Sequence, residues 1–246
     1  MTLPSKLHRA AAVLCWPALW LLFSNEGWWR AVLGPLAAPG QPVLFERISL
    51  ADAAQSHVLI VAAAMAGVIA LGLPLAVWAT RSTGRSFLQL ISNTAAIGQT
   101  FPPVAVLFLA TPVFGFGAQS IVLALFTYGL MPSVQGTLLG LQEASADAKE
   151  AAQGMGMGPA ELLRKVELPL ALPSILTGVR SSLVLLVATA SLAPMVGGVS
   201  LGTPIIAGLT VNNSAQVVEG AVAVAALAIA CDYSMRVLER CLTPWR

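Results

Sequence analysis

Long runs of largely apolar residues recur along this chain, and they restrict its fold more than any other feature. Six such runs are separated by charged and loop residues: 9–24, 57–80, 87–113, 120–141, 174–197 and 217–238. A helix of about 20 apolar residues crosses the hydrocarbon core of a bilayer. Only 10% of the residues are charged, whereas soluble domains average about 25%. We therefore predict an all-α integral membrane protein with about six transmembrane helices.

The basic residues predict how these helices are oriented, because Lys and Arg accumulate on the cytoplasmic side of a membrane. If the N-terminus is inside, only Arg30 and Arg47 of the 13 Lys and Arg residues face outward. The remaining 11 (13 minus 2) fall on the cytoplasmic side: Lys6, Arg9, Arg81, Arg85, Lys149, Arg164, Lys165, Arg180, Arg236, Arg240 and Arg246. Both termini are therefore expected in the cytoplasm.

The chain is expected to divide into residues 1–54, with the first transmembrane helix and an outer loop, and a transmembrane core over residues 55–240. The outer loop is expected to contain a short interfacial helix. Segment 197–216 ends in polar residues and is expected to dip partly into the bundle. Aromatic residues of the type favoured at headgroup level are expected to extend the first helix into the interface: Trp16, Trp20, Trp28 and Trp29.

A charged segment, residues 142–173, separates the fourth and fifth apolar runs. Residues 143–153 are rich in Ala and Glu and lack Pro and Gly, so they favour a helix that continues inward from the fourth run. The glycines that follow permit a sharp turn, since glycine adopts backbone angles closed to other residues: Gly154, Gly156 and Gly158.

A second short helix is expected after this turn. Pro159 suits its first position, and Glu161 and Lys165 are spaced to form an ion pair on it. Pro169 is expected to end it, and Pro173 to begin the fifth membrane span. From the residues alone, this hairpin is either a protein-docking element or an ordinary solvated loop.

A few polar residues at membrane depth are candidates for a solute pathway. Gln99 and Thr100 lie beside a helix break that is expected at Pro102 and Pro103. Backbone carbonyls that lose their helical hydrogen bonds at such a break suit a cationic solute. The alternative is local capping of the broken helix. Glu219, at the outer start of the sixth run, is either an interface residue or a charge in an outer vestibule.

Two pairs of residues predict packing within the bundle. Gly136 and Gly140 have the small-xxx-small spacing that lets two helices approach closely. Asp232 is followed four residues later by Arg236, so a local ion pair is expected near the inner end of the sixth run.

Several classes of function are disfavoured. A net charge of +2 with dispersed basic residues does not indicate nucleic-acid binding. The sequence contains no paired carboxylates, Ser-His-Asp set or His cluster that would indicate catalysis or a metal site. This observation also weighs against an intramembrane lipid enzyme. An ion-coupled secondary transporter remains the alternative, although the second, third and fourth runs contain no Asp, Glu, Lys or Arg.

The hairpin carries a recognisable motif. Glu150-Ala151-Ala152, then Gly156, Val166 and Leu168-Pro169 at their spacing, resembles the EAA loop of membrane subunits of binding-protein-dependent ABC importers. That family most often has Ile where this chain has Val166. Three segments, "GQTFPPVAVLFLATPVFGFG", "GMGMGPAELLRKVELPLALPSILTGVR" and "GGVSLGTPIIAGL", are similar to the osmoprotectant branch, the permeases for glycine betaine, choline and related quaternary amines. The resemblance extends over roughly residues 55–240.

This resemblance implies a type I ABC importer fold in a bacterial inner membrane, with segment 142–173 as a coupling hairpin on a cytoplasmic ATPase dimer. The residues implied to form that coupling site are Glu150, Ala151, Ala152, Gly154, Gly156, Gly158, Leu168 and Pro169. Since the chain lacks a G-x-x-x-x-G-K-[ST] phosphate loop, no cofactor is expected in it, and ATP and Mg would be bound by the partner ATPase. A second permease subunit, identical or different, and an external solute-binding protein would complete the assembly in the lipid bilayer.

Overall fold

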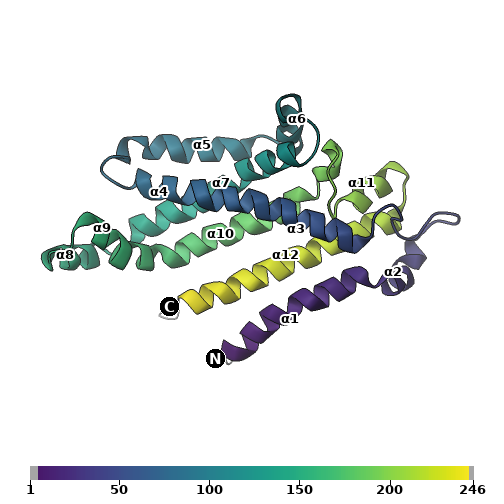
Figure 1. Cartoon of the computed structure of the whole chain (residues 1–246), viewed down its shortest axis with the longest axis horizontal. Coiled ribbons are helices and arrows are strands. Elements are labelled where there is room, and N and C mark those ends of the chain that lie inside the picture. The colour runs from purple at the N-terminus through teal and green to yellow at the C-terminus, as the bar shows by residue number, and fades with distance from the viewer. Residues whose placement is uncertain (1–4, 244–246) are drawn as a thin grey trace.

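The computed structural model describes residues 5–243 as an antiparallel helical bundle, and this part of the chain contains no strand (Figure 1). The helices are α1 (Ser5–Ser24), α2 (Glu26–Leu33), α3 (Leu50–Gly67), α4 (Leu73–Ala79), α5 (Leu88–Thr100), α6 (Pro103–Phe114), α7 (Ala118–Glu143), α8 (Ala146–Gly154), α9 (Pro159–Leu162), α10 (Leu168–Ala190), α11 (Thr203–Thr210) and α12 (Ser214–Leu242). Two π-helical segments, η2 (Val68–Gly72) and η4 (Leu163–Glu167), join α3 to α4 and α9 to α10. Arg246, counted above among the cytoplasmic residues, lies outside the described residues.

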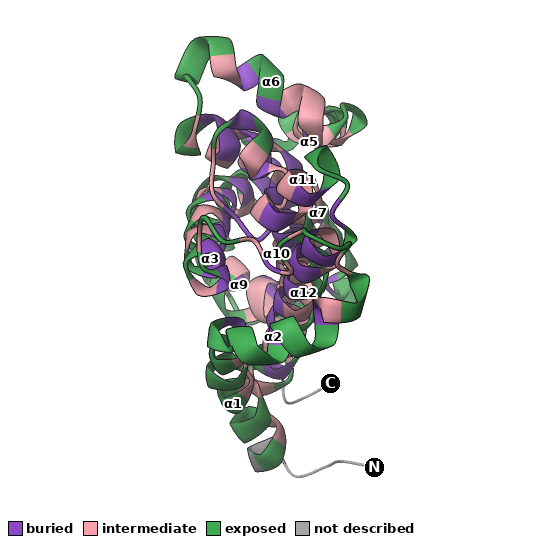
Figure 2. Ribbon diagram, turned by 90° about the vertical axis from the view of Figure 1, so that its right-hand side faces the viewer, coloured by how far each residue is buried: buried purple, intermediate pink, exposed green. Residues whose placement is uncertain are grey.

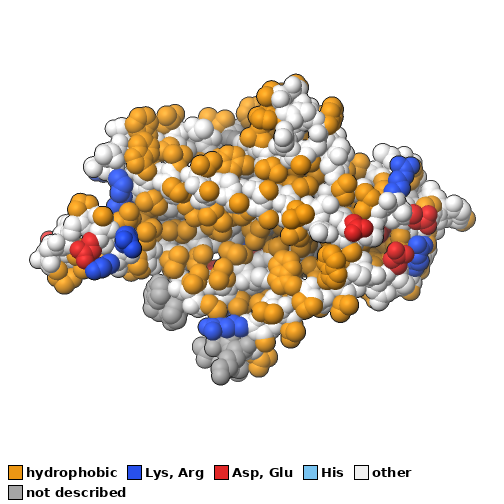
Figure 3. Space-filling model, in the orientation of Figure 1, with side chains coloured by type: hydrophobic (Ala, Val, Ile, Leu, Met, Phe, Trp, Pro, Cys, Tyr) orange, Lys and Arg blue, Asp and Glu red, His pale blue; other side chains and the backbone are white. Residues whose placement is uncertain are grey.

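Five continuous helical stretches are long and apolar enough to cross a membrane: Leu7–Ser24, Leu50–Ala79, Ala118–Glu143, Pro159–Ala190 and Ser214–Leu242. Figure 3 shows hydrophobic side chains over the middle of one face, with acidic and basic groups gathered toward the two ends of the bundle. Helices α8 and α9 lie at one end, toward which α1 begins and α12 ends, whereas α2 and α11 lie at the other (Figure 1). The prediction of a multi-pass α-helical membrane protein is confirmed.

The third predicted span, 87–113, is wrong as a single crossing. Phe101 and Pro102 have extended backbone angles and divide it into α5 and α6, of 13 and 12 residues. Proline provides no N–H group, and it forces the preceding residue out of the helical region. Two consecutive prolines therefore turn the chain, so that α5 lies against α4 and α7 while α6 packs on α7 near the end that carries α11 (Figure 1).

Pro169 does not end the second hairpin helix, as the sequence had indicated, and Pro173 does not begin a new one. A continuous helix runs over Pro159–Ala190, because η4 widens the hydrogen-bonding pattern immediately before Pro169. Segment η2 stands in the same way before Pro74 in the second span. In both cases the wider turn accommodates a residue that lacks the N–H group of a regular helix.

The helix of segment 143–153 also does not continue from the fourth span. Ala144 leaves the helical region with ψ 122°, and Ser145 begins α8 by accepting a hydrogen bond from the amide of Ala148 at 3.3 Å. A serine in this position competes with helix continuation, because its hydroxyl satisfies an amide at the start of a new helix. The structure thus separates α8 from the membrane helix.

The aromatic residues expected to extend the first helix divide between two helices. The chain turns at Asn25, whose side chain caps α2, so Trp28 and Trp29 do not continue α1. Trp29 is buried, and its indole N–H donates to the carbonyl of Leu22 at 2.8 Å. It therefore closes the corner between α1 and α2 instead of facing lipid headgroups. Helix α2 is the short helix expected in the outer loop.

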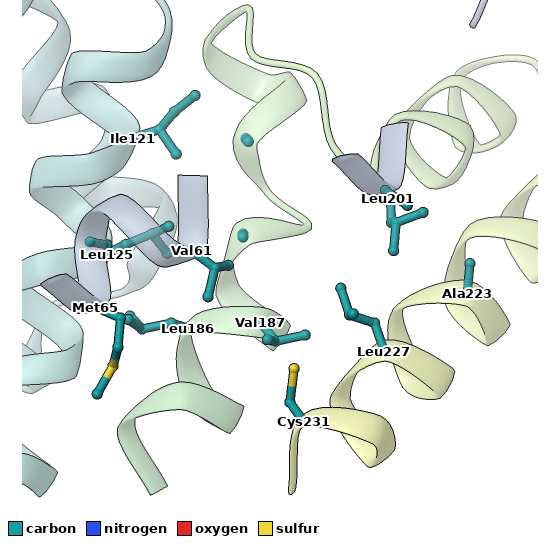
Figure 4. Packing of buried hydrophobic residues seen from close by; sticks show 14 of the residues in the cluster. Val61, Met65, Ile121, Leu125, Leu186, Val187, Leu201, Ala223, Leu227 and Cys231 are labelled. Atoms are coloured by element: carbon teal, nitrogen blue, oxygen red, sulfur yellow. The ribbon is translucent and has the colours of Figure 1, made fainter. Parts of the chain in front are cut away.

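Helices α7, α10 and α12 form the interior of the bundle, whereas α1 is peripheral. About half of the membrane-spanning window of α7 is buried (50%), and 44% in both α10 and α12, against 6% in α1 (Figure 2). Buried residues of α3, α7, α10 and α12 meet in one cluster (Figure 4), among them Val61, Leu125, Leu186, Val187 and Leu227. His57 is fully buried beside this cluster, with Nε2 donating to Val187 O and Nδ1 accepting from Leu201 N.

The glycine pair predicted to allow close approach lies at the contact of α7 with α10. A Cβ atom at Gly136 would come within 2.8 Å of Gly178 Cα, and one at Gly140 within 2.8 Å of Ala171 O. Both distances are shorter than carbon atoms tolerate, so the two backbones approach as closely as they do only because these side chains are absent.

Pro132 lies inside α7, and side chains of neighbouring helices bond the carbonyls beside it. Proline at this position cannot bond the carbonyl of Tyr128. Gln99 Nε2 of α5 donates to that carbonyl at 2.9 Å, and Ser182 Oγ of α10 donates to the next carbonyl, Gly129 O, at 2.6 Å. Ser182 also lies 2.7 Å from Ser133 Oγ. Gln99 therefore supplies the hydrogen bond that Pro132 cannot make, and Ser182 adds a second bond to the adjacent carbonyl from another helix.

Replacing Gly136 by Ala should destabilise the protein by about 1–3 kcal/mol, because the added methyl group forces α7 and α10 apart. Thermal unfolding in detergent measures the effect. Gly34→Ala is the matched control, since Gly34 has a negative φ and no atom within 4 Å of its added Cβ. Equal stability of the two variants would contradict the close contact.

Replacing Ser182 by Ala should cost about 1–2 kcal/mol, because the Gly129 carbonyl and the Ser133 hydroxyl both lose a buried partner. Ser181→Ala tests the adjacent exposed hydroxyl, which bonds only within its own helix. The same unfolding assay should give a clearly lower midpoint for Ser182→Ala and an unchanged one for Ser181→Ala.

Candidate functional site

The hairpin of α8 and α9 projects from one end of the bundle. Helix α8 ends at Gly154, and the chain turns through Gly156, which has φ +85°. Gly154 and Gly158 do not take positive φ angles, so the sharp turn depends on Gly156 alone. The amide of Met157 donates back to Ala152 O at 3.2 Å, which closes the turn against α8.

The predicted coupling residues separate into outward and inward groups. Glu150 and Ala151 are exposed on α8, whereas Ala152 is 1% exposed and faces the rest of the hairpin. Gly154, Gly156 and Gly158 are exposed, and Leu168 and Pro169 are half-buried at the base of the helix that follows. Of the predicted coupling residues, Glu150, Ala151 and the three glycines therefore lie on the free surface of the hairpin.

Met155 was not singled out from the sequence, yet it is the most prominent apolar side chain of this surface. It is 72% exposed at the tip, next to the turn. An exposed methionine is suited to irregular apolar contacts with a partner, because its side chain is flexible and polarizable. In the sequence, the only indication of this exposure was the position of Met155 between two glycines of the turn.

The base of the hairpin contains an ion cluster that sequence reasoning also missed. Glu167, whose side chain is 8% exposed, lies 2.5 Å from Arg81 Nη1 and 3.9 Å from Lys149 Nζ. The expected exposed pair is also present, with Lys165 Nζ 2.6 Å from Glu161 Oε1. The sequence placed Arg81 and Lys149 on the cytoplasmic side, but their shared acidic partner depends on how distant segments pack.

The pathway candidates on α5 are bonded to backbone groups. Thr100 Oγ1 donates to Ile97 O in its own helix at 2.8 Å, and Gln99 donates to α7 as described above. Thr100, Pro102 and the neighbouring Phe101 are exposed on the single chain, and Pro103 is half-buried. The break between α5 and α6 thus presents polar and aromatic groups on an outer face of the subunit.

Glu219 lies at the other end of the bundle and is 3% exposed. Its Oε2 accepts the amide of Phe45 at 3.0 Å, and it lines a cavity of about 340 Å³ together with Trp29 and Arg30. Asn213 and Gln216, spaced by three residues before it on one helix face, donate to the carbonyls of residues 42 and 44. Glu219 therefore helps to hold the outer loop on the start of α12.

The pair expected at the inner end of α12 is confirmed and forms part of a larger cluster. Arg236 Nε lies 2.7 Å from Asp232, and Arg180 of α10 lies 3.5 Å from Asp232 and 3.3 Å from Glu239. These acids are paired with arginines. Among the described residues, no group of three or more His, Cys, Asp or Glu is placed to hold a metal ion.

Comparison with known proteins agrees with this architecture. Residues 72–244 match the family described as "Binding-protein-dependent transport system inner membrane component". The choline transport system permease protein OpuBB of Bacillus subtilis is 41% identical over 59% of this chain and 67% of its own length. The osmoprotectant import permease protein OsmY of Salmonella typhimurium is 34% identical over 80% of this chain and 84% of its own.

A solved structure is similar in fold. The MetNI methionine ABC transporter in an inward-facing conformation superposes with a TM-score of 0.70 at 20% identity, covering 79% of this chain and 96% of that one. The chain therefore belongs to the family of binding-protein-dependent transport system inner membrane components, as a multi-pass permease subunit of an ABC importer and not itself an enzyme.

Proposed function

We propose that this permease imports glycine betaine, choline, carnitine or a closely related quaternary amine. The observation that carries this proposal is the likeness to permeases named for those solutes, including the glycine betaine/carnitine/choline permease OpuCB of Bacillus subtilis at 38% identity. The same branch is indicated by the three quoted segments, which lie around the α5–α6 break, from the glycine turn into α10, and around α11.

The hairpin is proposed to be the contact with a cytoplasmic ATPase dimer. Glu150 provides an exposed charged anchor, and Ala151 permits close approach of a partner surface. Gly156 sets the turn that presents them, and Ala152 holds α8 against the rest of the hairpin. Leu168 and Pro169 fix the direction in which the chain returns to the membrane. Gly154 and Gly158 are exposed at the tip and add no side chains beside that of Met155.

The rest of the assembly follows from this contact. ATP and Mg would be bound and used by the ATPase subunits, on the side where α8 lies, α1 begins and α12 ends (Figure 1). This side is proposed to be the cytoplasm, in agreement with the excess of basic residues there. A solute-binding protein would meet the opposite end, at α2 and α11. A second permease subunit, identical or different, would face this one across the pathway.

The pathway is proposed to pass the break between α5 and α6. Thr100 and the exposed ring of Phe101 lie there, and a cationic amine is attracted both to carbonyl groups and to aromatic faces. Gln99 supports the break by its bond to α7, and Pro102 and Pro103 keep it open. Glu219 is proposed to contribute its carboxylate to an outer vestibule, through the cavity that it lines beside Trp29 and Arg30.

Uptake of radiolabelled glycine betaine, choline and carnitine tests the proposal directly. Proteoliposomes that contain the permease with its ATPase and binding protein should accumulate at least one of these solutes only when ATP is supplied. Dissipating proton and sodium gradients should not change the rate. Uptake by the permease alone under an ion gradient would instead indicate a secondary transporter.

Replacing Gly156 by Ala should weaken ATPase binding about fivefold to thirtyfold, because an L-residue in the left-handed region costs roughly 1–2 kcal/mol. Copurification of the ATPase at graded concentrations measures the affinity. Gly34→Ala is the control, since Gly34 lies at the other end of the bundle and has a negative φ and open space around it. If Gly156→Ala binds the ATPase like the wild type, the proposed role of the turn is wrong.

A further inference from the structure

Glu167 connects three parts of the chain that are far apart in sequence. It is the last residue of the π-helical segment η4, at the base of the helix that returns to the membrane as α10. Arg81 follows α4, at the inner end of the second span. Lys149 belongs to α8, the first helix of the hairpin. One carboxylate therefore receives a cation from the second span and another from the hairpin.

The two cations are held in place by further contacts. Thr80 Oγ1 accepts hydrogen bonds from Arg81 Nε at 3.1 Å and from Nη2 at 2.8 Å, which leaves Nη1 directed at Glu167. Lys149 Nζ also donates to Leu141 O, in the last turn of α7, at 3.1 Å. Since Glu167 is buried and the basic side chains are about three-quarters buried, the cluster has a defined geometry.

The helices that meet at this cluster both contain a place where they bend easily. Segment η2 and Pro74 interrupt the regular pattern in the second span, and η4 and Pro169 do so in the fifth. Such π-helical segments are frequent at functional sites, and prolines weaken the local hydrogen-bond ladder. Each helix can therefore change direction at a defined position when its inner end is moved.

We propose that Glu167, Arg81 and Lys149 form a positioning ion cluster that transmits movement of the hairpin into the second and fifth membrane spans. The proposal rests on the ATPase contact described under "Proposed function". When the ATPase displaces α8, Lys149 moves with it, and Glu167 and Arg81 carry the displacement to η4 and to the end of α4. Without the cluster the ATPase still binds the hairpin and hydrolyses ATP, but the membrane helices do not follow.

The variant Glu167→Gln removes the shared charge while keeping the shape of the side chain. The double variant R81Q/E167Q removes the closest opposing charges together, so that no buried carboxylate is left without its nearest cation. The control is Glu161→Gln, which breaks an ion pair of the same type on the exposed side of the same hairpin. All are studied in the full transporter with ATPase and binding protein, reconstituted in proteoliposomes.

Three readouts separate transmission from a merely structural role. The first is copurification of the ATPase with its ATP hydrolysis, and the second is glycine betaine, choline or carnitine taken up per ATP. The third is the ATP-dependent distance change between spin labels at exposed Leu75 in α4 and Ile229 in α12, after Cys15, Cys231 and Cys241 are replaced by Ser. The third readout does not depend on which solute is carried.

In Glu167→Gln and in R81Q/E167Q, ATPase binding and hydrolysis should remain near wild type. Uptake per ATP should fall about tenfold, and the label distance should cease to respond to ATP. Glu161→Gln should match the wild type in all three readouts.

A normal distance response in the two cluster variants overturns the proposal, and so does loss of ATPase binding in both. If the wild type takes up none of the three amines while its labels respond to ATP, only the proposed substrate is wrong.

Discussion

Inside a bilayer, a backbone carbonyl that a proline has deprived of its partner finds no water to replace it. This chain has 16 prolines, several of them within its membrane helices, and the structure depends on how each one is accommodated. Near Pro132, side chains of α5 and α10 donate hydrogen bonds to carbonyls of α7, and these bonds connect the three helices at the same depth in the bundle. At Pro74 and Pro169 a π-helical turn precedes the proline, and the helix continues. At Pro102 and Pro103 the helix ends and the chain changes direction.

The two ends of the bundle are held by different kinds of interaction. At the end with α2 and α11, uncharged side chains and one carboxylate of α12 bond the backbone of residues 42–45. At the end with α8 and α9, charged pairs predominate, including Glu167 with two cations and Arg180 with two acids. Backbone bonds fix a loop to one position, whereas ion pairs between side chains of different helices connect helices that can move as units. The moving parts of an importer are expected where the second kind predominates.

Local composition was enough to predict the membrane class, the run of antiparallel helices and the glycine turn, because each depends on residues close together in the chain. The same reasoning failed at Pro169, since a π-helical turn leaves no distinct pattern of residue types. Ser145 did carry a signal for a new helix, but the helix-forming residues around it concealed that signal. The ion pair of Arg81 with Glu167 joins residues 86 positions apart, and only the packed bundle brings them together. Among the three tip glycines, the backbone geometry alone distinguishes Gly156.

The close contact between α7 and α10 has a mechanical consequence. One of these helices leads into the hairpin and the other leads out of it, and their backbones touch at Gly136, Gly140 and Gly178. The hydroxyl groups of Ser133 and Ser182 join them again at the centre of the bundle. A pair held so tightly is expected to move as one unit. Opening a passage for a solute would then shift α7 and α10 together relative to the surrounding helices, since separating the two would expose bare backbone to hydrocarbon.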